Sequence, residues 1–196
     1  MIYIAKIIDE VQAPIDTYVA TIIYGSAQLF GCWLSTLTTD RFGRRPLLLL
    51  SCSSVATCHC ILGVFFLLQS LDYDLIDYSW LPILAFTVLG FSFASGLGPL
   101  TALVCNEMFN PEFASICNCI LITGYAVLTF ILLKVFPLLV SIIGFHNCFF
   151  IFVATCTIGF FVILIMIPET RGRSIESIRN EMEQKKDSIT PEDVPR

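Results

Sequence analysis

The sequence predicts an all-α membrane protein whose chain crosses the bilayer several times. Hydrophobic residues make up 56% of the 196 residues and charged residues only 14%, whereas soluble proteins usually carry about 25% charged residues. The charges are also segregated. No Asp, Glu, Lys or Arg lies between Arg45 and Asp72, and Lys134 is alone between Glu112 and Glu169. A soluble fold needs charge along its whole surface, and a chain wetted by lipid does not.

Apolar segments of sufficient length recur along the chain. A helix needs about 20 apolar residues to cross the roughly 30 Å hydrocarbon layer. Five segments meet this length, at approximately 17–38, 46–69, 80–105, 114–136 and 144–167. Residues 1–8 are apolar but too few to span, and we expect them to end an element whose beginning is absent. The short connections predict adjacent antiparallel helices, and they lie at 39–45, 70–79, 106–113 and 137–143.

The distribution of Lys and Arg predicts the orientation of these spans. Basic residues cluster at 41–45 and again at 171–186, after the last span. Five spans put both clusters on the same side, which the positive-inside rule assigns to the cytosol. The 70–79 connection then faces outside, and it has three acids and no base. The 106–113 connection departs from the rule, since it is expected to be cytosolic and has no Lys or Arg.

Two regions follow from this division. Residues 1–167 form the helical bundle, and residues 168–196 form a cytosolic tail. In the tail we expect a short helix capped by Ser174, with a Glu181–Lys185 pair at i,i+4 spacing. The stretch after Lys186 has a composition typical of disorder.

Several classes of function are disfavoured by composition. The nine cysteines lie in or beside apolar runs without metal-ligand spacing, so we expect small hydrophobes at helix contacts rather than disulfides or a zinc site. We expect no metal and no cofactor. No basic patch is typical of nucleic-acid binding, and residues 1–16 are too charged for a secretory signal. His59, inside a span, is expected to hydrogen-bond to a neighbouring helix.

The strongest local motif is D-R-F-G-R-R-P at 40–46. Asp40 ends one predicted helix, Gly43 allows a tight reversal, and Pro46 lies at the start of the next helix. Arg41, Arg44 and Arg45 then lie where headgroups meet water. A plain positive-inside anchor is the alternative interpretation.

A second motif, G-L-G-P at 96–99, lies inside the third span. Pro99 has no N–H, so the carbonyl of Ser95 loses its helical partner. Gly96 and Gly98 soften the helix further. Such breaks are typical of binding sites and gates in transporters, although a merely kinked, closely packed helix remains the alternative.

Acidic residues follow two of the spans on the predicted cytosolic side. Glu107 follows the third span, and Glu169 with Arg171 follows the last. Together with Asp40 and the three arginines, these groups predict an interhelical ion-pair network. Each exposed pair is worth on the order of 1 kcal/mol, and a network that breaks as a unit can bias a two-state equilibrium.

These motifs together resemble the C-terminal half of the sugar porter family in the major facilitator superfamily. The matching segments are D-R-F-G-R-R at 40–45, G-L-G-P and N-E-M-F at 96–109, and P-E-T-R-G at 168–172. Their spacing is similar to that of insect facilitated trehalose transporters and animal glucose transporters. The resemblance implies part of a twelve-helix fold, with a stub of the seventh helix and the eighth to twelfth complete. It also implies that the N-terminal six-helix half is missing.

The resemblance implies a sugar pathway at a few positions. Gln28 stands where the family usually has a pore-facing Asn, and Tyr125 and Ala126 stand where it usually has Asn-Trp, with Thr129 one turn further. After G-x-G-P the family usually reads I-P-W, and this chain has Leu100, Thr101 and Ala102. The implied pathway residues are therefore Gln28, Gly96, Gly98, Pro99, Thr101, Tyr125 and Thr129.

The functional expectation is a facilitative carrier for a hexose or a trehalose-like sugar, working by alternating access in the plasma membrane. Its partners are membrane lipid, the sugar, and the missing half or another subunit. No Asp or Glu lies inside a span, so no carboxylate is placed for proton coupling. The alternatives are a non-transporting truncated or accessory membrane protein and, least favoured, a membrane enzyme.

Overall fold

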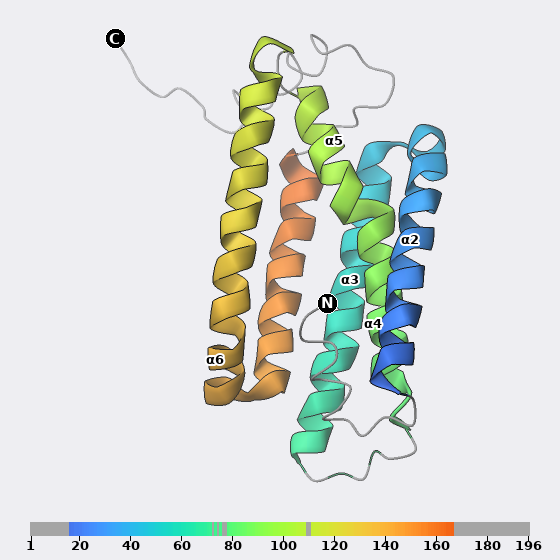
Figure 1. Cartoon of the computed structure of the whole chain (residues 1–196), viewed down its shortest axis with the longest axis vertical. Coiled ribbons are helices and arrows are strands. Elements are labelled where there is room, and N and C mark those ends of the chain that lie inside the picture. The colour runs from blue at the N-terminus through green and yellow to red at the C-terminus, as the bar shows by residue number, and fades with distance from the viewer. Residues whose placement is uncertain (1–15, 72, 74, 76–77, 109–110, 167–196) are drawn as a thin grey trace, which may run out of the picture.

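The computed structural model describes residues 16–71, 73, 75, 78–108 and 111–166, and these form a helical bundle (Figure 1). The expected stub at 1–8 and the tail at 168–196 lie outside the described residues. The elements are α2 (Thr17–Phe42), α3 (Arg44–Ser70), α4 (Leu81–Ser92), a π-helical turn η2 (Phe93–Leu97), α5 (Gly98–Met108) and α6 (Pro111–Met166).

The reversal between α2 and α3 consists of one residue, Gly43. Its backbone has φ 90° and ψ 163°, a region that essentially only glycine occupies. At the other end of α2, the side chain of Asp16 accepts a hydrogen bond from the N–H of Tyr18 at 3.2 Å and caps the helix. The tight reversal predicted at Gly43 is confirmed.

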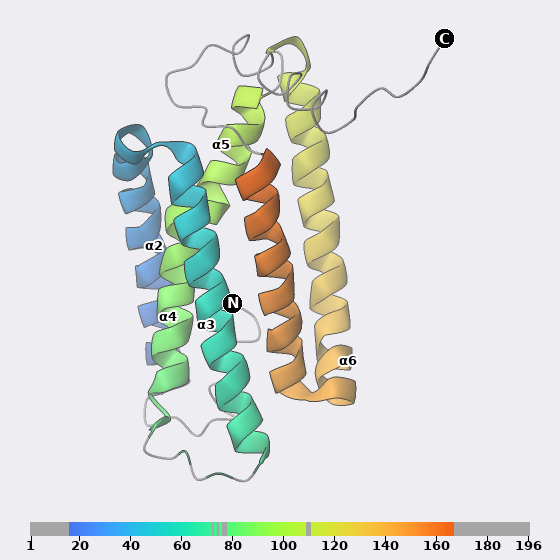
Figure 2. The same cartoon turned by 180° about the vertical axis from the view of Figure 1, so that it is seen from behind.

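The long element α6 consists of two antiparallel helical segments joined at Gly144, and we call these segments its two rods. Gly144 has φ 80° and ψ 165°, outside the helical region. A straight helix of 56 residues would measure about 84 Å, far more than the roughly 30 Å apolar layer. Figures 1 and 2 show the chain folding back at this point. The connection predicted at 137–143 is therefore wrong in place, because the helix continues through Pro137 and reverses at the glycine.

The helix α3 is the centre of the packing. It contacts α4 and η2 on one side and the part of α6 after Gly144 on the other, while α2 packs mainly on α4 (Figure 2). One apolar core joins Leu62, Phe66 and Phe86 to Phe149. A second core joins Leu48, Leu100 and Ile163 nearer the Gly43 reversal.

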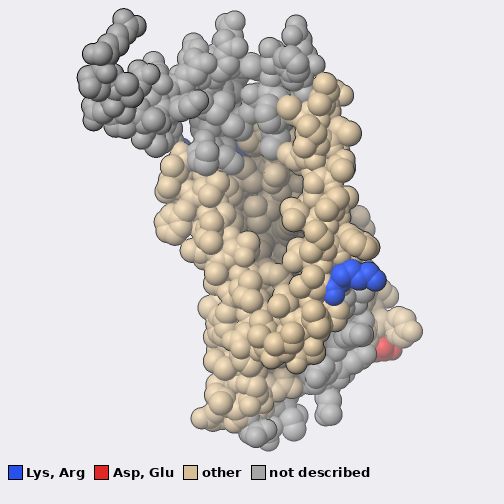
Figure 3. Space-filling view, turned by 90° about the vertical axis from the view of Figure 1, so that its left-hand side faces the viewer, with Lys and Arg blue, Asp and Glu red and all other residues tan. Residues whose placement is uncertain are grey.

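Within the described part of the chain, three helical stretches have the length and composition to cross a membrane. They are Arg44–Ser70, Leu81–Val104 and Ser115–Ile165. The last includes the reversal at Gly144, so it supplies two rods. Figure 3, seen from the side of α6, presents an almost entirely uncharged face among the described residues. This surface suits contact with lipid.

Candidate functional site

The third predicted span is interrupted by the π-helical turn η2, and a serine of α3 enters its hydrogen-bond ladder. Ser51 Oγ donates to the carbonyl oxygen of Ser92 at 2.6 Å and accepts from the N–H of Leu97 at 3.1 Å. In a regular π-helix these two backbone groups, five residues apart, bond to each other. The Ser51 hydroxyl therefore lies between them and satisfies both.

Further hydroxyls complete this contact, and we call Ser51, Ser54, Ser92 and Ser95 the serine cluster. The Oγ atoms of Ser54 and Ser92 lie 2.7 Å apart, and Ser95 Oγ donates to the Ser92 carbonyl at 3.1 Å. Ser51 and Ser92 are buried. Polar groups that bond across helices hold them together where apolar burial supplies little driving force.

Sequence reasoning missed the serine cluster, although a signal was present. The run S-C-S-S at 51–54 places Ser51 and Ser54 three residues apart, and Ser92 and Ser95 share the same spacing. Residues three apart lie on one face of a helix. Two such pairs on neighbouring apolar spans are the pattern that interhelical hydroxyl contacts require.

Glycines bring η2 and α4 close to their neighbours. A Cβ on Gly96 would lie 2.3 Å from Ser51 Cβ, and a Cβ on Gly90 would lie 2.5 Å from a ring carbon of Tyr24. A Cβ on Gly31 of α2 would meet the Phe91 carbonyl oxygen at 2.7 Å. Gly96 thus has a packing role at the Ser51 contact, beyond the softening expected from the sequence.

The other predicted residues of this motif lie at the surface of the described chain. Gly98 and Pro99 are exposed at the start of α5. The N–H of Gly98 bonds to the carbonyl of Phe93, five residues back, which extends the π-helical pattern to the proline. Thr101 is exposed, and its Oγ1 donates to the Leu97 carbonyl at 2.5 Å. The irregularity expected near Pro99 is present, beginning at Phe93.

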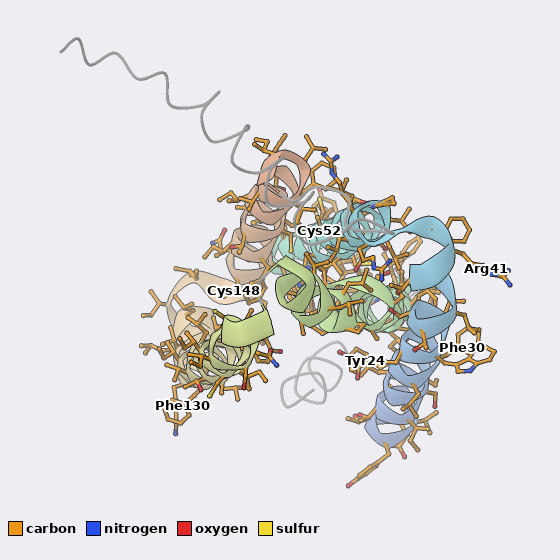
Figure 4. The ribbon with its side chains drawn as sticks, turned by 90° about the horizontal axis from the view of Figure 1, so that it is seen from above. Tyr24, Phe30, Arg41, Cys52, Phe130 and Cys148 are labelled. Carbon is orange, nitrogen blue, oxygen red and sulfur yellow. The ribbon has the colours of Figure 1, made fainter. Side chains whose placement is uncertain are left out.

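On α2, Gln28 is half-buried beside a buried tyrosine. Its Nε2 donates to the hydroxyl of Tyr24 at 3.2 Å. Figure 4 shows Tyr24 pointing from α2 toward the middle of the bundle, whereas Phe30 points outward. The amide of Gln28 is therefore paired with a hydroxyl on the inner side of α2.

Tyr125 and Thr129 lie on α6 before Gly144 and are remote from Gln28. Tyr125 is 63% exposed, and Thr129 Oγ1 donates to the Tyr125 carbonyl at 2.8 Å. The two views of the ribbon place this part of α6 across the bundle from α2 (Figures 1 and 2). The described chain does not bring these two predicted groups of residues into contact.

At the other end of the bundle, Arg45 reaches the end of α6. Its Nη2 donates to the carbonyl oxygen of Leu164 at 2.6 Å. The residue four positions after Leu164 is Pro168. Proline has no N–H, so this carbonyl has no i+4 backbone donor, and the guanidinium satisfies it instead.

The rest of the predicted ion-pair network is only partly within the described structure. Arg44 begins α3 and is half-buried, and Arg41 is exposed and points outward in Figure 4. The side chains of Asp40 and Glu107, and all of Glu169 and Arg171, lie outside the described residues. Pairing between these groups stays a prediction.

The expectation for His59 is wrong in one respect. Its Nδ1 lies 2.8 Å from the carbonyl of Val55, on its own helix rather than a neighbouring one. The neighbouring helix is contacted by the ring instead, which packs against Phe149 and Phe152 of α6 at centroid distances of 6.2 and 5.5 Å. The helix itself therefore satisfies Nδ1 of the imidazole through the i−4 carbonyl.

Comparison with known sequences assigns the family. The sequence model described as "Sugar (and other) transporter" matches residues 1–182. The chain belongs to this sugar transporter family. The family consists of membrane transporters of the major facilitator superfamily rather than enzymes, so the chain is part of a multi-pass integral membrane protein.

Individual relatives show how much of the family's length is present. This sugar-transporter chain is 31% identical over 180 residues to a facilitated trehalose transporter Tret1-2 homolog of Drosophila simulans, covering 92% of the chain and 37% of the relative. It is 32% identical to facilitated trehalose transporter Tret1 of Polypedilum vanderplanki, covering 92% and 36%. The chain thus spans little more than a third of these relatives.

A solved structure supports the fold. A double tryptophan mutant of XylE matches with a TM-score of 0.72 at 20% identity, over 85% of this chain and 35% of that one. The bundle therefore corresponds to part of a major facilitator fold.

Proposed function

We propose that this sugar-transporter chain is the C-terminal part of a facilitative carrier for a hexose or a trehalose-like disaccharide that works by alternating access. The observation that carries the proposal is the interrupted third span, where η2 is joined to α3 through Ser51. Interrupted spans are typical of the binding sites and gates of transporters. The facilitated trehalose transporters among its relatives suggest the class of sugar.

In this proposal the chain crosses the plasma membrane five times, with its tail in the cytosol. The crossings are α2, α3, the α4–η2–α5 span and the two rods of α6. The one-residue reversals at Gly43 and Gly144 support this count, because each joins antiparallel helices. The arginines beside Gly43 support a cytosolic position for that end.

The proposed pathway combines the predicted residues with the serine cluster. Gln28, Gly98, Pro99, Thr101, Tyr125 and Thr129 line it, and the N-terminal half of the carrier closes the opposite side. Gln28 and its Tyr24 partner supply donors and acceptors for sugar hydroxyls. At the cytosolic end, the arginines pair with Glu107 or Glu169, while Arg45 also bonds to the Leu164 carbonyl of α6.

A second candidate is an accessory membrane protein that does not transport. It is favoured by the exposure of α6: 17% of its most apolar stretch is buried, against 39% in α3 and 44% in the third span. Such a helix offers a large surface to a partner subunit. Transport by the completed carrier separates the two candidates.

The experiment joins this chain to the N-terminal part of a facilitated trehalose transporter and reconstitutes the chimera in liposomes. We expect saturable uptake of labelled trehalose or glucose that unlabelled sugar blocks. Gln28→Leu should lower that uptake about tenfold, the loss expected when a buried amide no longer bonds a sugar hydroxyl. Gln69→Leu, which changes a half-buried amide at the end of α3, should not. A folded chimera without uptake would favour the accessory protein.

A further inference from the structure

The ring of Tyr24 is held against the backbone of α4 at Gly90. The tyrosine is 8% exposed and belongs to the same apolar core as Phe86. A Cβ added to Gly90 would lie 2.5 Å from Cε2 of the ring, 3.0 Å from Cδ2 and 3.1 Å from Cζ. Three adjacent ring atoms therefore pack on the glycine itself. A ring enclosed this closely keeps one rotamer, because a packed interior leaves few voids into which it could turn.

A second glycine contact holds α2 in place on the same side. A Cβ added to Gly31 would lie 2.7 Å from the carbonyl oxygen of Phe91 and 3.1 Å from Cβ of Ala94. Gly31 follows Tyr24 by seven positions, so both lie on the face of α2 that meets α4 and η2. The two contacts set the distance and the rotation between these helices around Gln28, which lies between the two residues in the sequence.

The hydroxyl of Tyr24 determines which end of the Gln28 amide is turned toward it. Gln28 follows one turn later, and its Nε2 donates to Tyr24 Oη at 3.2 Å. An amide group has two donors on its nitrogen and an acceptor on its oxygen. Because both atoms are bonded to one trigonal carbon, turning Nε2 toward Tyr24 turns Oε1 away from it. Gln28 is half-buried, and Figure 4 shows Tyr24 reaching toward the middle of the bundle.

Packing alone does not require this hydroxyl. Phenylalanine would fill the same place on Gly90, and the core around Tyr24 consists of apolar side chains such as Leu62 and Phe86. The hydroxyl instead contacts an amide on its own helix. An amide without that contact would sample several orientations, each with a different pattern of donors and acceptors. The contact therefore directs the amide.

We infer that Tyr24 is a positioning residue for sugar recognition. Its hydroxyl fixes the amide of Gln28 so that Oε1 accepts a hydrogen bond from one hydroxyl of the sugar. The inference rests on the proposed function, which places Gln28 in the sugar pathway. A site with a fixed acceptor rejects a sugar that lacks the matching donor, whereas a free amide can turn and present an N–H instead.

The test measures how well fluorinated sugars compete for uptake. It uses the chimera described above, in liposomes, with the labelled sugar that it takes up. The competitors are unlabelled glucose and a set of glucose analogues, in each of which fluorine replaces a different hydroxyl. Fluorine is similar in size to a hydroxyl and has no proton to donate. We expect one analogue to bind about tenfold more weakly than glucose, the loss of one hydrogen bond. Gln28→Leu should abolish that difference.

Removing the Tyr24 hydroxyl separates a positioning role from a packing role. Tyr24→Phe keeps the ring on Gly90 and frees the amide, so the tenfold difference should fall to about threefold or less, while the maximal rate of uptake changes by less than about twofold. A packing role would lower the yield of folded chimera or the maximal rate and leave the difference unchanged. Tyr18→Phe is the matched control, because Tyr18 is 79% exposed at the start of α2, and it should alter neither quantity.

The outcomes distinguish this inference from the function on which it rests. A folded chimera without uptake would remove both. Two results would overturn the inference alone while uptake persists. In one, Gln28→Leu abolishes the difference for none of the analogues, and in the other, Tyr24→Phe leaves unchanged the difference that Gln28→Leu abolishes.

The geometry has a further check that needs no transport. NMR relaxation of the side-chain amide of Gln28 is measured in the purified chain in micelles, and the signal is identified by its loss in Gln28→Leu. We expect an order parameter close to that of rigid backbone in the unaltered chain, and a value below about 0.6 in Tyr24→Phe. Equal mobility of this amide in the two proteins would show that the hydroxyl does not position it.

Discussion

At the residue scale, one hydroxyl joins two helices by taking the place of a backbone hydrogen bond. Ser51 Oγ lies between the Ser92 carbonyl and the Leu97 N–H, both inside an apolar span. A buried backbone group that loses its partner there finds no water to replace it. The geometry of η2 therefore depends on a side chain 41 positions earlier in the sequence.

Removing that hydroxyl should loosen η2. Ser51→Ala leaves the Leu97 N–H without its partner and should lower the free energy of unfolding by about 1–3 kcal/mol. Unfolding in mixed micelles followed by tryptophan fluorescence gives this value, and amide exchange at Leu97 should become faster. Ser53→Ala is the control, because Ser53 is exposed and its Oγ donates to the Leu50 carbonyl on its own helix. Unchanged exchange at Leu97 would refute the role of Ser51.

The guanidinium of Arg45 satisfies the Leu164 carbonyl of α6, whose i+4 residue is Pro168 and offers no N–H. Arg45→Gln should lower stability by about 0.5–1.5 kcal/mol, since it removes the charge-assisted bond to the Leu164 carbonyl. Amide exchange should rise over 163–166. Arg45→Lys keeps the charge and should restore part of the protection. If both variants are as stable as the unaltered chain, the contact with Leu164 does not contribute to stability.

At the scale of elements, two glycines make the reversals of the bundle in the same way. Gly43 has φ 90° and ψ 163°, and Gly144 has φ 80° and ψ 165°. Asn tolerates the left-handed helical region near ψ 45°, but these ψ values lie far from it. Neither position therefore accepts the usual substitute for glycine.

Substitution at Gly144 tests this geometry. Gly144→Ala and Gly144→Asn should each cost about 1–3 kcal/mol, because both side chains are strained at this φ and ψ. Gly124→Ala is the matched control, since nothing lies within 4 Å of the added Cβ, and it should stabilise α6 by up to about 1 kcal/mol. Thermal unfolding of the three variants gives the order. Full recovery with Asn would mean that residue 144 adopts a left-handed helical turn.

The sequence predicts where the helices lie better than it predicts where the chain reverses between them. Hydrophobic length locates α3, the third span and the two rods of α6, because a span must satisfy its own backbone within the bilayer. Among the described helices, α2 is not apolar enough to meet the same criterion. The connection expected to begin at Pro137 lies instead at Gly144. A proline inside a helix removes one backbone hydrogen bond and kinks the helix, whereas a glycine can adopt the φ of 80° that the reversal requires. The π-helical turn depends on Ser51, which lies 41 positions before Ser92. The serine spacing within each span marks a polar face, but it does not specify which helix that face meets.

The candidate site is likewise predicted only in part, because the sequence shows local motifs and does not show contacts between distant helices. The motif at 96–99 marks the interrupted span, and Gln28 lies on the inner side of α2 as its amide requires. Whether Gln28 comes close to Tyr125 and Thr129 depends on how the two rods of α6 pack relative to α2. That arrangement is set by packing across the whole bundle, and residue spacing along the chain does not contain it.

At the scale of the whole molecule, the rod of α6 before Gly144 is largely exposed. Large apolar side chains such as Ile120, Leu128 and Phe130 are each more than 60% exposed, and in Figure 4 Phe130 points outward. Lipid accepts these groups, but it offers no hydrogen-bond partner to the hydroxyl of Tyr125, which is 63% exposed. We expect a second set of helices to pack against that side.

Without that cover the chain should not move sugar. The purified 196-residue chain, reconstituted alone with labelled glucose and trehalose, should give uptake no greater than empty vesicles, because alternating access requires two halves that rock against each other. Tags placed at residues 75 and 190 provide a check of insertion and should label from opposite sides. Saturable uptake that unlabelled sugar blocks would show that this part of the carrier is sufficient.

The π-helical turn also sets the direction in which each later side chain of the third span points around the helix axis. A π turn contains one residue more than an α turn, and one residue corresponds to about 100° of rotation about the helix axis. Leu100 and Val104 are buried against Leu47 and Leu48 in this rotated frame. Deleting a single residue such as Ala94 would return the span to one continuous register and turn those side chains away from α3. The face that α5 offers to its surroundings is thus fixed by one inserted residue, and insertions and deletions at 93–97 should be far less tolerated than substitutions there.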